Sequence, residues 1–251
     1  MKHTMSKRFV IFSMGRTGST LLASLLNSHP QILCDGEIFT PVRWTRGLRS
    51  LARFWQRHPF PYLAYRQTRM ALLHQKTIYG FKLHTKPQGA QLADVGGFLR
   101  SAVQTGWKII HLQRRSLFDQ VISSMVANQT GWYFGDESKD EPPASLNISA
   151  TRFCRVLQKS YRASEFNRTV LDGLPCVALT YEHDLSDSAV WETTVTRICD
   201  YLEIQTAPTT RSGVEKPWRR PYCEIVTNYA ELLSLYHEWI AKEDGERCPS
   251  N

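Results

Sequence analysis

Residues 8–26 read RFVIFSMGRTGSTLLASLL, and this stretch decides the fold. The apolar run at its start predicts a buried strand over Arg8–Ser13, and the leucines at its end predict a helix through Leu21–Leu26. Glycines in the turn between them let backbone N–H groups approach an anion, and the start of the following helix adds unpaired donors and partial positive charge. The stretch therefore predicts a strand, a phosphate-binding turn and a helix in succession.

The turn is not one of the common nucleotide-binding loops. A Walker A loop places a Lys directly after its last glycine, whereas here Ser19 follows Gly18 and the loop holds no Lys. The dinucleotide pattern G-x-G-x-x-G is also missing from it. Hydrolysis of ATP or GTP is therefore disfavoured, while a phosphate-bearing ligand is not.

Further strand patterns alternate with helical ones, which is typical of a parallel sheet with crossover helices. We expect an α/β fold, P-loop-like and three-layered, whose parallel central sheet has four or five strands flanked by helices. A single domain is expected over 1–251, with a basic insertion at about 40–75 and a surface loop at about 131–147. The other expected strands are Gln31–Cys34, Thr77–His84, Lys108–Leu112 and Cys176–Tyr181, and the other expected helices begin near Ser116 or cover Ala189–Leu202 and Glu224–Lys242.

Composition limits the class of protein. Apolar residues make up 42% of the 251, enough for a core, which excludes a disordered or collagen-like chain. Lys and Arg exceed Asp and Glu by 31 to 23, so the net charge is +8 and an anionic partner is expected. The six cysteines lack metal-ligand spacing, so no metal site is expected. No apolar run reaches 18 residues and no signal peptide is evident, so we expect a cytoplasmic enzyme or one at a membrane surface.

A second motif follows the strand that ends at Leu112. Arg114 and Arg115 leave this strand, and Ser123 stands eight residues after Arg115, inside the next expected helix. An Arg at a strand end and a Ser in the following helix can converge on one phosphate from two elements. Both Arg114 and Arg115 are candidates for the partner of Ser123.

Together these motifs resemble the sulfotransferase superfamily, which uses 3′-phosphoadenosine 5′-phosphosulfate as sulfo donor. The bacterial branch that includes nodulation-factor sulfotransferases is the most similar. The shared segments run from about Arg8 to Leu232, and besides the two motifs above they are SHPQ at 28–31, GE at 36–37, GFK at 80–82 and NYAEL at 228–232.

The resemblance implies a donor site and leaves one choice within it open. Arg115 and Ser123 would contact the 3′-phosphate, although Arg114 is an alternative to Arg115. An aromatic ring and two cations near the C-terminus would close over the nucleotide. The residues expected to bind the donor are Gly15, Arg16, Thr17, Gly18, Ser19, Thr20, Arg114, Arg115, Ser123, Trp218, Arg219 and Arg220.

The resemblance also implies catalytic roles for Glu37, Arg16 and Lys82, without a metal. Glu37 would accept the proton of the acceptor hydroxyl, although an acid after Gly is also common as a turn or capping residue. Lys82 would contact the transferred sulfonate or the acceptor, or else lie at the rim. His29 is a rival base, but its place before Pro30 favours a structural role. His84 and His111 lie on strands beside the site, where a lone His is more often a packed residue.

The segment from Ile38 to Ala93 contains no Asp or Glu but ten Lys and Arg, more positive charge than the net of the whole chain. A basic helix is predicted by the helical spacing of Arg46, Arg49, Arg53 and Arg57, and it is either only solvated or forms an acceptor or membrane surface. We expect an oligosaccharide or glycolipid acceptor, in keeping with the resemblance.

Two other functions stay open. A small-molecule kinase would suit a phosphate-binding loop, but the missing loop Lys and the Arg115/Ser123 pair weigh against it. A nucleic-acid-binding module would use the basic segment but would leave the loop unexplained, so nucleic acid is not the expected partner.

Overall fold

A computed structural model describes residues 7–40, 49–74, 76–85, 91–131, 145–207 and 221–247. The contacts of the chain divide it into two compact units, each with a hydrophobic core of its own. The first comprises Met1–Arg115 and Ala163–Val214, and the second comprises Ser116–Arg162 and Glu215–Asn251. The expected single domain over 1–251 stays a prediction.

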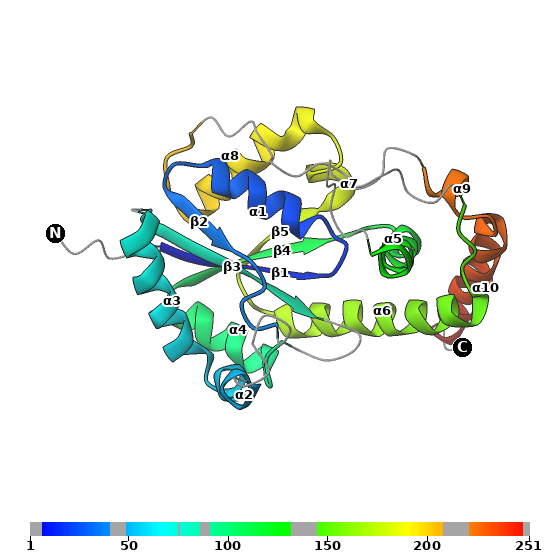
Figure 1. The fold of residues 1–251 in the computed structure, drawn as a ribbon, viewed down its shortest axis with the longest axis horizontal. Coiled ribbons are helices and arrows are strands. Elements are labelled where there is room, and N and C mark those ends of the chain that lie inside the picture. Colours follow the sequence, from blue (N-terminus) through cyan, green and yellow to red (C-terminus); the bar gives the residue numbers. More distant parts are fainter. Residues whose placement is uncertain are drawn as a thin grey trace. The chain divides into compact units, whose positions relative to one another are not determined.

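The first unit is built on a parallel sheet of five strands (Figure 1). The strand order is β2-β3-β1-β4-β5, and each neighbouring pair is parallel. The predicted α/β fold with a parallel sheet of four or five strands is therefore confirmed. The strands are β1 (Lys7–Met14), β2 (Ile32–Asp35), β3 (Ile78–Thr85), β4 (Trp107–Gln113) and β5 (Cys176–Thr180).

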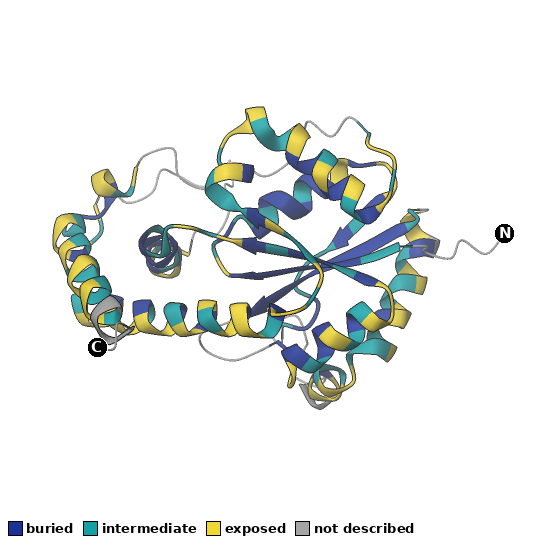
Figure 2. Ribbon diagram, turned by 180° about the vertical axis from the view of Figure 1, so that it is seen from behind, coloured by how far each residue is buried: buried dark blue, intermediate teal, exposed yellow. Residues whose placement is uncertain are grey.

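Helices cover both faces of this sheet, which is why a central strand such as β1 has a continuous apolar run rather than strict alternation. Phe9 and Ile11 of β1 pack in the core that contains α1 and α8, while Val10 and Phe12 pack on the other face with α3 and α4. Figure 2 shows the resulting burial of the strands. These helices are α1 (Ser19–Ser28), α3 (Pro59–His74), α4 (Val95–Gln104) and α8 (Trp191–Leu202).

Shorter elements complete the first unit. Helix α2 (Arg49–Arg57) precedes α3, and α7 (Tyr181–Asp184) follows β5 directly. The helix predicted over Ala189–Leu202 is split into a 3-10 turn, η3 (Ser188–Val190), and α8. Predicted strand ends agree with the observed ones to within one residue.

The second unit is helical, with α5 (Leu117–Thr130) and α10 (Tyr229–Arg247) in one core. Helix α6 (Ala150–Leu171) begins in this unit and ends in the first. The single helix predicted over Glu224–Lys242 is wrong: α9 (Tyr222–Ile225) ends before α10 begins. The break arises because Val226 forms a β-bridge with Leu146, whose backbone N–H donates to the carbonyl of Ile225.

The carboxyl edge of the sheet gathers the residues that the sequence motifs singled out. Parallel strands all end at this edge, which is where α/β folds bind ligands. The turn at 15–18 follows β1, Gly36 and Glu37 follow β2, and Arg114 and Arg115 follow β4. Within the described ranges, no helix is long and apolar enough to span a membrane.

Candidate active site

The turn after β1 has the backbone of an anion-binding cradle. Arg16 and Gly18 both have left-handed backbone angles, with φ of 65° and 86°. A Cβ on Gly18 would lie 2.6 Å from Cδ2 of Tyr181, so glycine is required there by space as well as by conformation. The left-handed Arg16 is a strained conformation of the kind that clusters at functional sites.

Helix α1 starts at Ser19, immediately after this turn. Among the described residues no side chain caps its N-terminus, and its first turn holds no acid. The first backbone N–H groups of a helix have no partner within the helix, and they carry partial positive charge. This end of α1 therefore suits an anionic ligand.

Lys82 brings a cation to the same place from β3. Its side chain is 7% exposed, and its Nζ donates a hydrogen bond of 3.0 Å to Oγ1 of Thr20. An ammonium group held away from water exerts a stronger field than a solvated one. The structure thus places Lys82, buried, beside the first turn of α1, and its contact with sulfonate or acceptor stays a prediction.

The carboxylate of Glu37 is held on both of its oxygens. Oε2 accepts hydrogen bonds from Nε2 of Gln91 at 2.8 Å and from Oγ1 of Thr40 at 2.9 Å. Oε1 lies 3.1 Å from Nδ1 of His84. The side chain remains one-quarter exposed, so a ligand can reach it. Such fixation is more than a turn-capping acid requires.

His84 connects Glu37 to the loop. Its Nε2 lies 2.9 Å from Oγ of Ser19, so one buried imidazole contacts residues from two sides of the site. The sequence predicts His84 to be a packed strand residue and gives no indication of Gln91. The signal available was that Lys82 and His84 are two residues apart, which puts them on the same face of a strand.

The other histidines behave as expected of structural residues. His29 is buried, its Nδ1 accepts from the backbone N–H of Gln31 at 3.1 Å, and its Nε2 lies 3.0 Å from the carbonyl of Gln205. Burial lowers the pKa of His111 on β4. Neither has a described contact with Glu37.

The side chain of Arg114 contacts the backbone of the turn after β1. Its Nη1 donates to the carbonyl oxygen of Arg16 at 3.4 Å, and its guanidinium lies 5.0 Å from the ring centre of Tyr181. Its Nε is 3.6 Å from Oε1 of Glu182, and the side chain is 14% exposed. The side chain of Arg114 is thus directed to the turn at 15–18.

Arg115 differs from its neighbour, because it is exposed and its backbone N–H donates to Oε2 of Glu182 at 2.9 Å. Ser123 is buried on α5, in the other compact unit. Their convergence on one phosphate stays a prediction. Trp218, Arg219 and Arg220 lie outside the described residues.

Some cations of the acid-free segment at 38–93 are engaged in structural contacts. Arg66 pairs with Asp35, which also accepts a 3.2 Å hydrogen bond from the hydroxyl of Tyr79. Asp35 raises the pKa of Arg66 against the effect of burial. Nζ of Lys76 donates to backbone carbonyls, among them that of Ile32. These two cations, like Lys82, do not form an outer basic surface.

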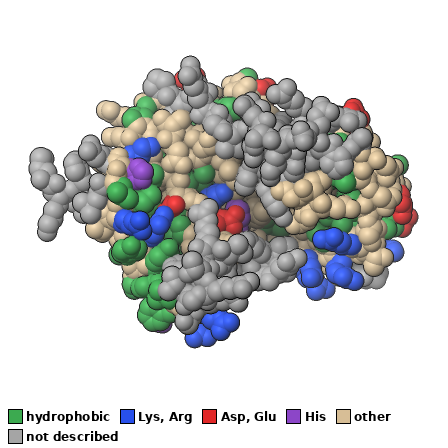
Figure 3. All heavy atoms as spheres, in the orientation of Figure 1, with side chains coloured by type: hydrophobic (Ala, Val, Ile, Leu, Met, Phe, Trp, Pro, Cys, Tyr) green, Lys and Arg blue, Asp and Glu red, His purple; other side chains and the backbone are tan. Residues whose placement is uncertain are grey.

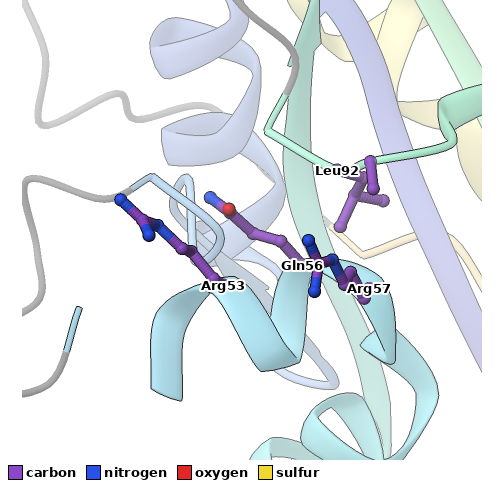
Figure 4. A pocket seen from close by; sticks show the side chains of 5 residues that line it. Arg53, Gln56, Arg57 and Leu92 are labelled. Carbon is purple, nitrogen blue, oxygen red and sulfur yellow. The ribbon is translucent and has the colours of Figure 1, made fainter. Parts of the chain in front are cut away.

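Exposed cations remain on α2. Arg53 and Arg57 line a cavity of about 370 Å³ together with Gln56, Leu92 and Ala93 (Figure 4). Nε2 of Gln56 donates to the carbonyl of Phe39, two residues after Glu37, at 3.1 Å. Gln91, the residue before Leu92, is the one that donates to Glu37. Two of the residues that line the cavity thus contact or adjoin the segments that hold the carboxylate. Arg43 and Arg46 lie outside the described residues.

Acidic, basic and histidine side chains lie next to one another at one place on the surface that Figure 3 shows. In the parts of the chain that the structure describes, no group of three or more His, Cys, Asp or Glu is arranged to hold a metal ion.

Comparisons with known proteins agree with the motifs. No protein-family model matches the chain. Over 167 residues, 65% of the chain, it is 31% identical to nodulation protein H of Rhizobium tropici, and it covers 62% of that protein. Over 234 residues it is 26% identical to nodulation protein H of Rhizobium meliloti, covering 89% of both chains.

Two solved structures resemble the chain at 16% identity. One is a sulfotransferase domain from the curacin biosynthetic pathway, with a TM-score of 0.44 and coverage of 82% of this chain and 77% of that one. The other is a sulfotransferase domain from the olefin synthase of Synechococcus PCC 7002, with a TM-score of 0.43 and coverage of 84% and 78%.

The parallel sheet with its glycine turn and flanking helices defines a P-loop-like α/β protein. Within this class, the chain is a distant homologue of nodulation protein H. The predicted resemblance to the nodulation branch is thereby confirmed.

Proposed function

We propose that this protein is a sulfotransferase that moves a sulfo group from 3′-phosphoadenosine 5′-phosphosulfate to an acceptor hydroxyl. One observation carries the proposal: the fixed carboxylate of Glu37 lies one imidazole ring away from Ser19, at the start of α1. A base for the acceptor and a cradle for an anionic donor thus occupy one site. The distant homology to nodulation protein H supports the same reading.

The residues of the turn fit the 5′ end of the donor. Gly18 keeps the cradle open where a Cβ would meet Tyr181, and the start of α1 offers backbone donors. Arg114 would stabilise the turn through the carbonyl of Arg16, which leaves Arg115 with Ser123 for the 3′-phosphate. The donor supplies the sulfo group together with a phosphate leaving group.

Sulfuryl transfer resembles phosphoryl transfer, in which an enzyme mainly positions in-line groups and stabilises charge. Negative charge grows on the bridging oxygen of the leaving phosphate. Lys82, bonded to Thr20 in the first turn of α1, and Arg16, in the turn itself, are the cations that would stabilise this charge. Preorganised donors at such a position are worth more than mobile ones, because they need not reorganise during the reaction.

Glu37 would take the proton of the acceptor hydroxyl. Thr40, Gln91 and His84 hold its carboxylate without fully covering it. A general base positioned in this way contributes about 10²- to 10⁴-fold to the rate.

For the acceptor we propose an oligosaccharide or glycolipid. The cavity beside α2 is lined by Leu92, which follows Gln91 in the chain, and Arg53 and Arg57 give it positive charge. Polar sugar groups and an anionic headgroup both suit arginine donors. An amphipathic basic helix also allows peripheral contact with an anionic membrane.

A labelling experiment tests the proposal against the kinase alternative. The protein is incubated in EDTA with ³⁵S-labelled donor and oligosaccharides, with and without an acyl chain, and in parallel with Mg²⁺ and γ-³²P-ATP. We expect ³⁵S in the oligosaccharide and no ³²P. Transfer of ³²P alone would establish a kinase. Preference for the acylated oligosaccharide would favour a glycolipid acceptor over a free glycan.

A further inference from the structure

One imidazole ring contacts both sides of the candidate active site. His84 is 5% exposed, with Nδ1 at 3.1 Å from Oε1 of Glu37 and Nε2 at 2.9 Å from Oγ of Ser19. We propose that His84 is a positioning residue that fixes the acceptor base relative to the donor loop. This inference rests on the proposed function, because it assigns Glu37 to the acceptor and Ser19 to the donor.

Hydrogen-bond chemistry makes the two contacts of the ring interdependent. An ionised carboxylate only accepts, so Nδ1 of His84 must carry a proton toward Glu37. In the neutral imidazole Nε2 then accepts, and it takes the single proton of the Ser19 hydroxyl. In the imidazolium Nε2 donates instead, and the Ser19 proton is left for an anion at the loop. In both states the ring fixes the direction of the Ser19 hydroxyl.

A second path from His84 reaches the other oxygen of the same carboxylate. The backbone N–H of His84 donates to Oε1 of Gln91 at 3.0 Å, and Nε2 of Gln91 donates to Oε2 of Glu37 at 2.8 Å. Both oxygens of Glu37 are therefore held from position 84, one by the imidazole ring and the other through the backbone N–H and Gln91. The carboxylate cannot rotate without breaking one of these contacts.

An acid and a cation both belong to the surroundings of the His84 ring. Glu37 is the acid in contact, and Lys82 is the cation two residues earlier on the same strand face, bonded to Thr20 of α1. Ser13 of β1 is the strand neighbour of His84 and is uncharged. The ring thus contacts the acid of the acceptor side and Ser19 of α1, one residue before the Thr20 that binds Lys82. Fixing reacting groups in this way is a recognised source of rate enhancement.

Two conservative substitutions separate the two contacts. In His84→Asn the side-chain amide nitrogen takes the place of Nδ1, so the contact with Glu37 is retained and that with Ser19 is lost. In His84→Gln the amide nitrogen takes the place of Nε2, so the reverse holds. The matched controls are His111→Asn and His111→Gln, on the neighbouring strand β4.

The readouts are calorimetric affinity for adenosine 3′,5′-bisphosphate and kcat in ³⁵S transfer, with a thermal melt for folding. For His84→Asn we expect an affinity loss of about tenfold with kcat reduced less than about threefold, because one hydrogen bond to the loop is lost. For His84→Gln we expect nearly unchanged affinity and a kcat lower by about tenfold or more. If His84→Asn and His84→Gln change affinity and kcat equally, or change neither, His84 is not a positioning residue.

A spectroscopic measurement keeps the test decisive if either variant fails to fold. In ¹⁵N NMR of the imidazole nitrogens, Glu37→Gln should shift Nδ1 of His84 and Ser19→Ala should shift Nε2 of the same ring. Absence of both shifts would also overturn the role. Wild-type protein that neither binds the bisphosphate nor transfers ³⁵S would refute the proposed function itself. An active wild type whose variants lack the expected effects would refute only the role of His84.

Discussion

Nδ1 of His84 lies 3.1 Å from Oε1 of Glu37, a contact made across two adjacent parallel strands. Glu37 follows β2 and His84 is the penultimate residue of β3, so the register of these strands brings the pair together at the carboxyl edge. Glu37 lies in the loop after β2, and the register of the sheet sets this loop against the end of β3, which suits a base that must keep its geometry during a reaction.

Replacement of Glu37 by Gln should remove most of the turnover and leave donor binding nearly intact. The amide keeps the shape of the side chain and one accepting oxygen but loses the basicity of the carboxylate. We expect kcat to fall by about 10²-fold or more, as measured by ³⁵S transfer. Glu203→Gln, at an exposed acid paired with Lys7 and Lys108, is the control and should keep wild-type kcat. A Glu37 variant with near wild-type kcat would exclude Glu37 as the base.

Arg115→Ala and Ser123→Ala should weaken binding of 3′-phosphoadenosine 5′-phosphosulfate far more than that of adenosine 5′-phosphosulfate, which lacks the 3′-phosphate. Loss of a charge-assisted hydrogen bond costs about 1.5–3 kcal/mol, or roughly 10- to 150-fold in affinity. Competition binding with both nucleotides measures the difference.

Arg114→Ala is the matched comparison, because Arg114 contacts the carbonyl of Arg16 in the turn. It should weaken binding of both nucleotides to a similar extent. If Arg114→Ala shows the selective loss and Arg115→Ala does not, the two arginines have exchanged roles.

The ion pair between Arg66 and Asp35 should contribute to stability rather than to catalysis. The side chains of Arg66 and Asp35 are 20% and 11% exposed, so removal of Arg66 leaves the Asp35 carboxylate mostly buried without its cation. Arg66→Leu should lower the free energy of unfolding by about 3 kcal/mol in urea denaturation. Glu203→Gln, at a surface pair, should change it little. An Arg66 variant as stable as the wild type would show that water replaces the guanidinium.

Charge reversal on α2 should affect the acceptor and not the donor. Arg53→Glu with Arg57→Glu inverts two exposed charges at the cavity, and each basic residue near an anionic surface contributes about 1 kcal/mol. We expect a higher KM for the acceptor, weaker co-sedimentation with anionic vesicles at low salt, and unchanged affinity for the bisphosphate.

The control for this prediction is Arg152→Glu with Arg155→Glu, at two exposed arginines of α6. If both double variants behave like the wild type toward acceptor and vesicles, the α2 face is only solvated. Loss of vesicle binding with a normal acceptor KM would separate membrane contact from acceptor recognition.

The sheet and its loop were predictable because local patterns determine them. The run at 9–12 is apolar on both faces, and the glycine turn directly precedes a leucine-rich helix, so β1 and α1 follow from neighbouring residues. Glu37 and Lys82 were found through motifs shared with a family. These signals need no knowledge of distant contacts.

The remaining parts of the site depend on contacts that no local pattern reveals. His84 meets Ser19 and Glu37 only after the strands pair, so a lone histidine in a strand gave no indication of a bridge. Arg66 looked like one of ten surface cations until Asp35 and Tyr79 were found beside it. The break before α10 likewise depends on Val226 meeting Leu146.

Calorimetric titration with adenosine 3′,5′-bisphosphate in EDTA tests the central claim most directly, because it requires no acceptor. If the loop and Arg115 hold the donor nucleotide, the wild-type protein binds one bisphosphate saturably without metal, and AMP, which lacks the 3′-phosphate, binds far more weakly. Absence of bisphosphate binding, together with binding of ATP that depends on Mg²⁺, would contradict a sulfotransferase and favour a kinase.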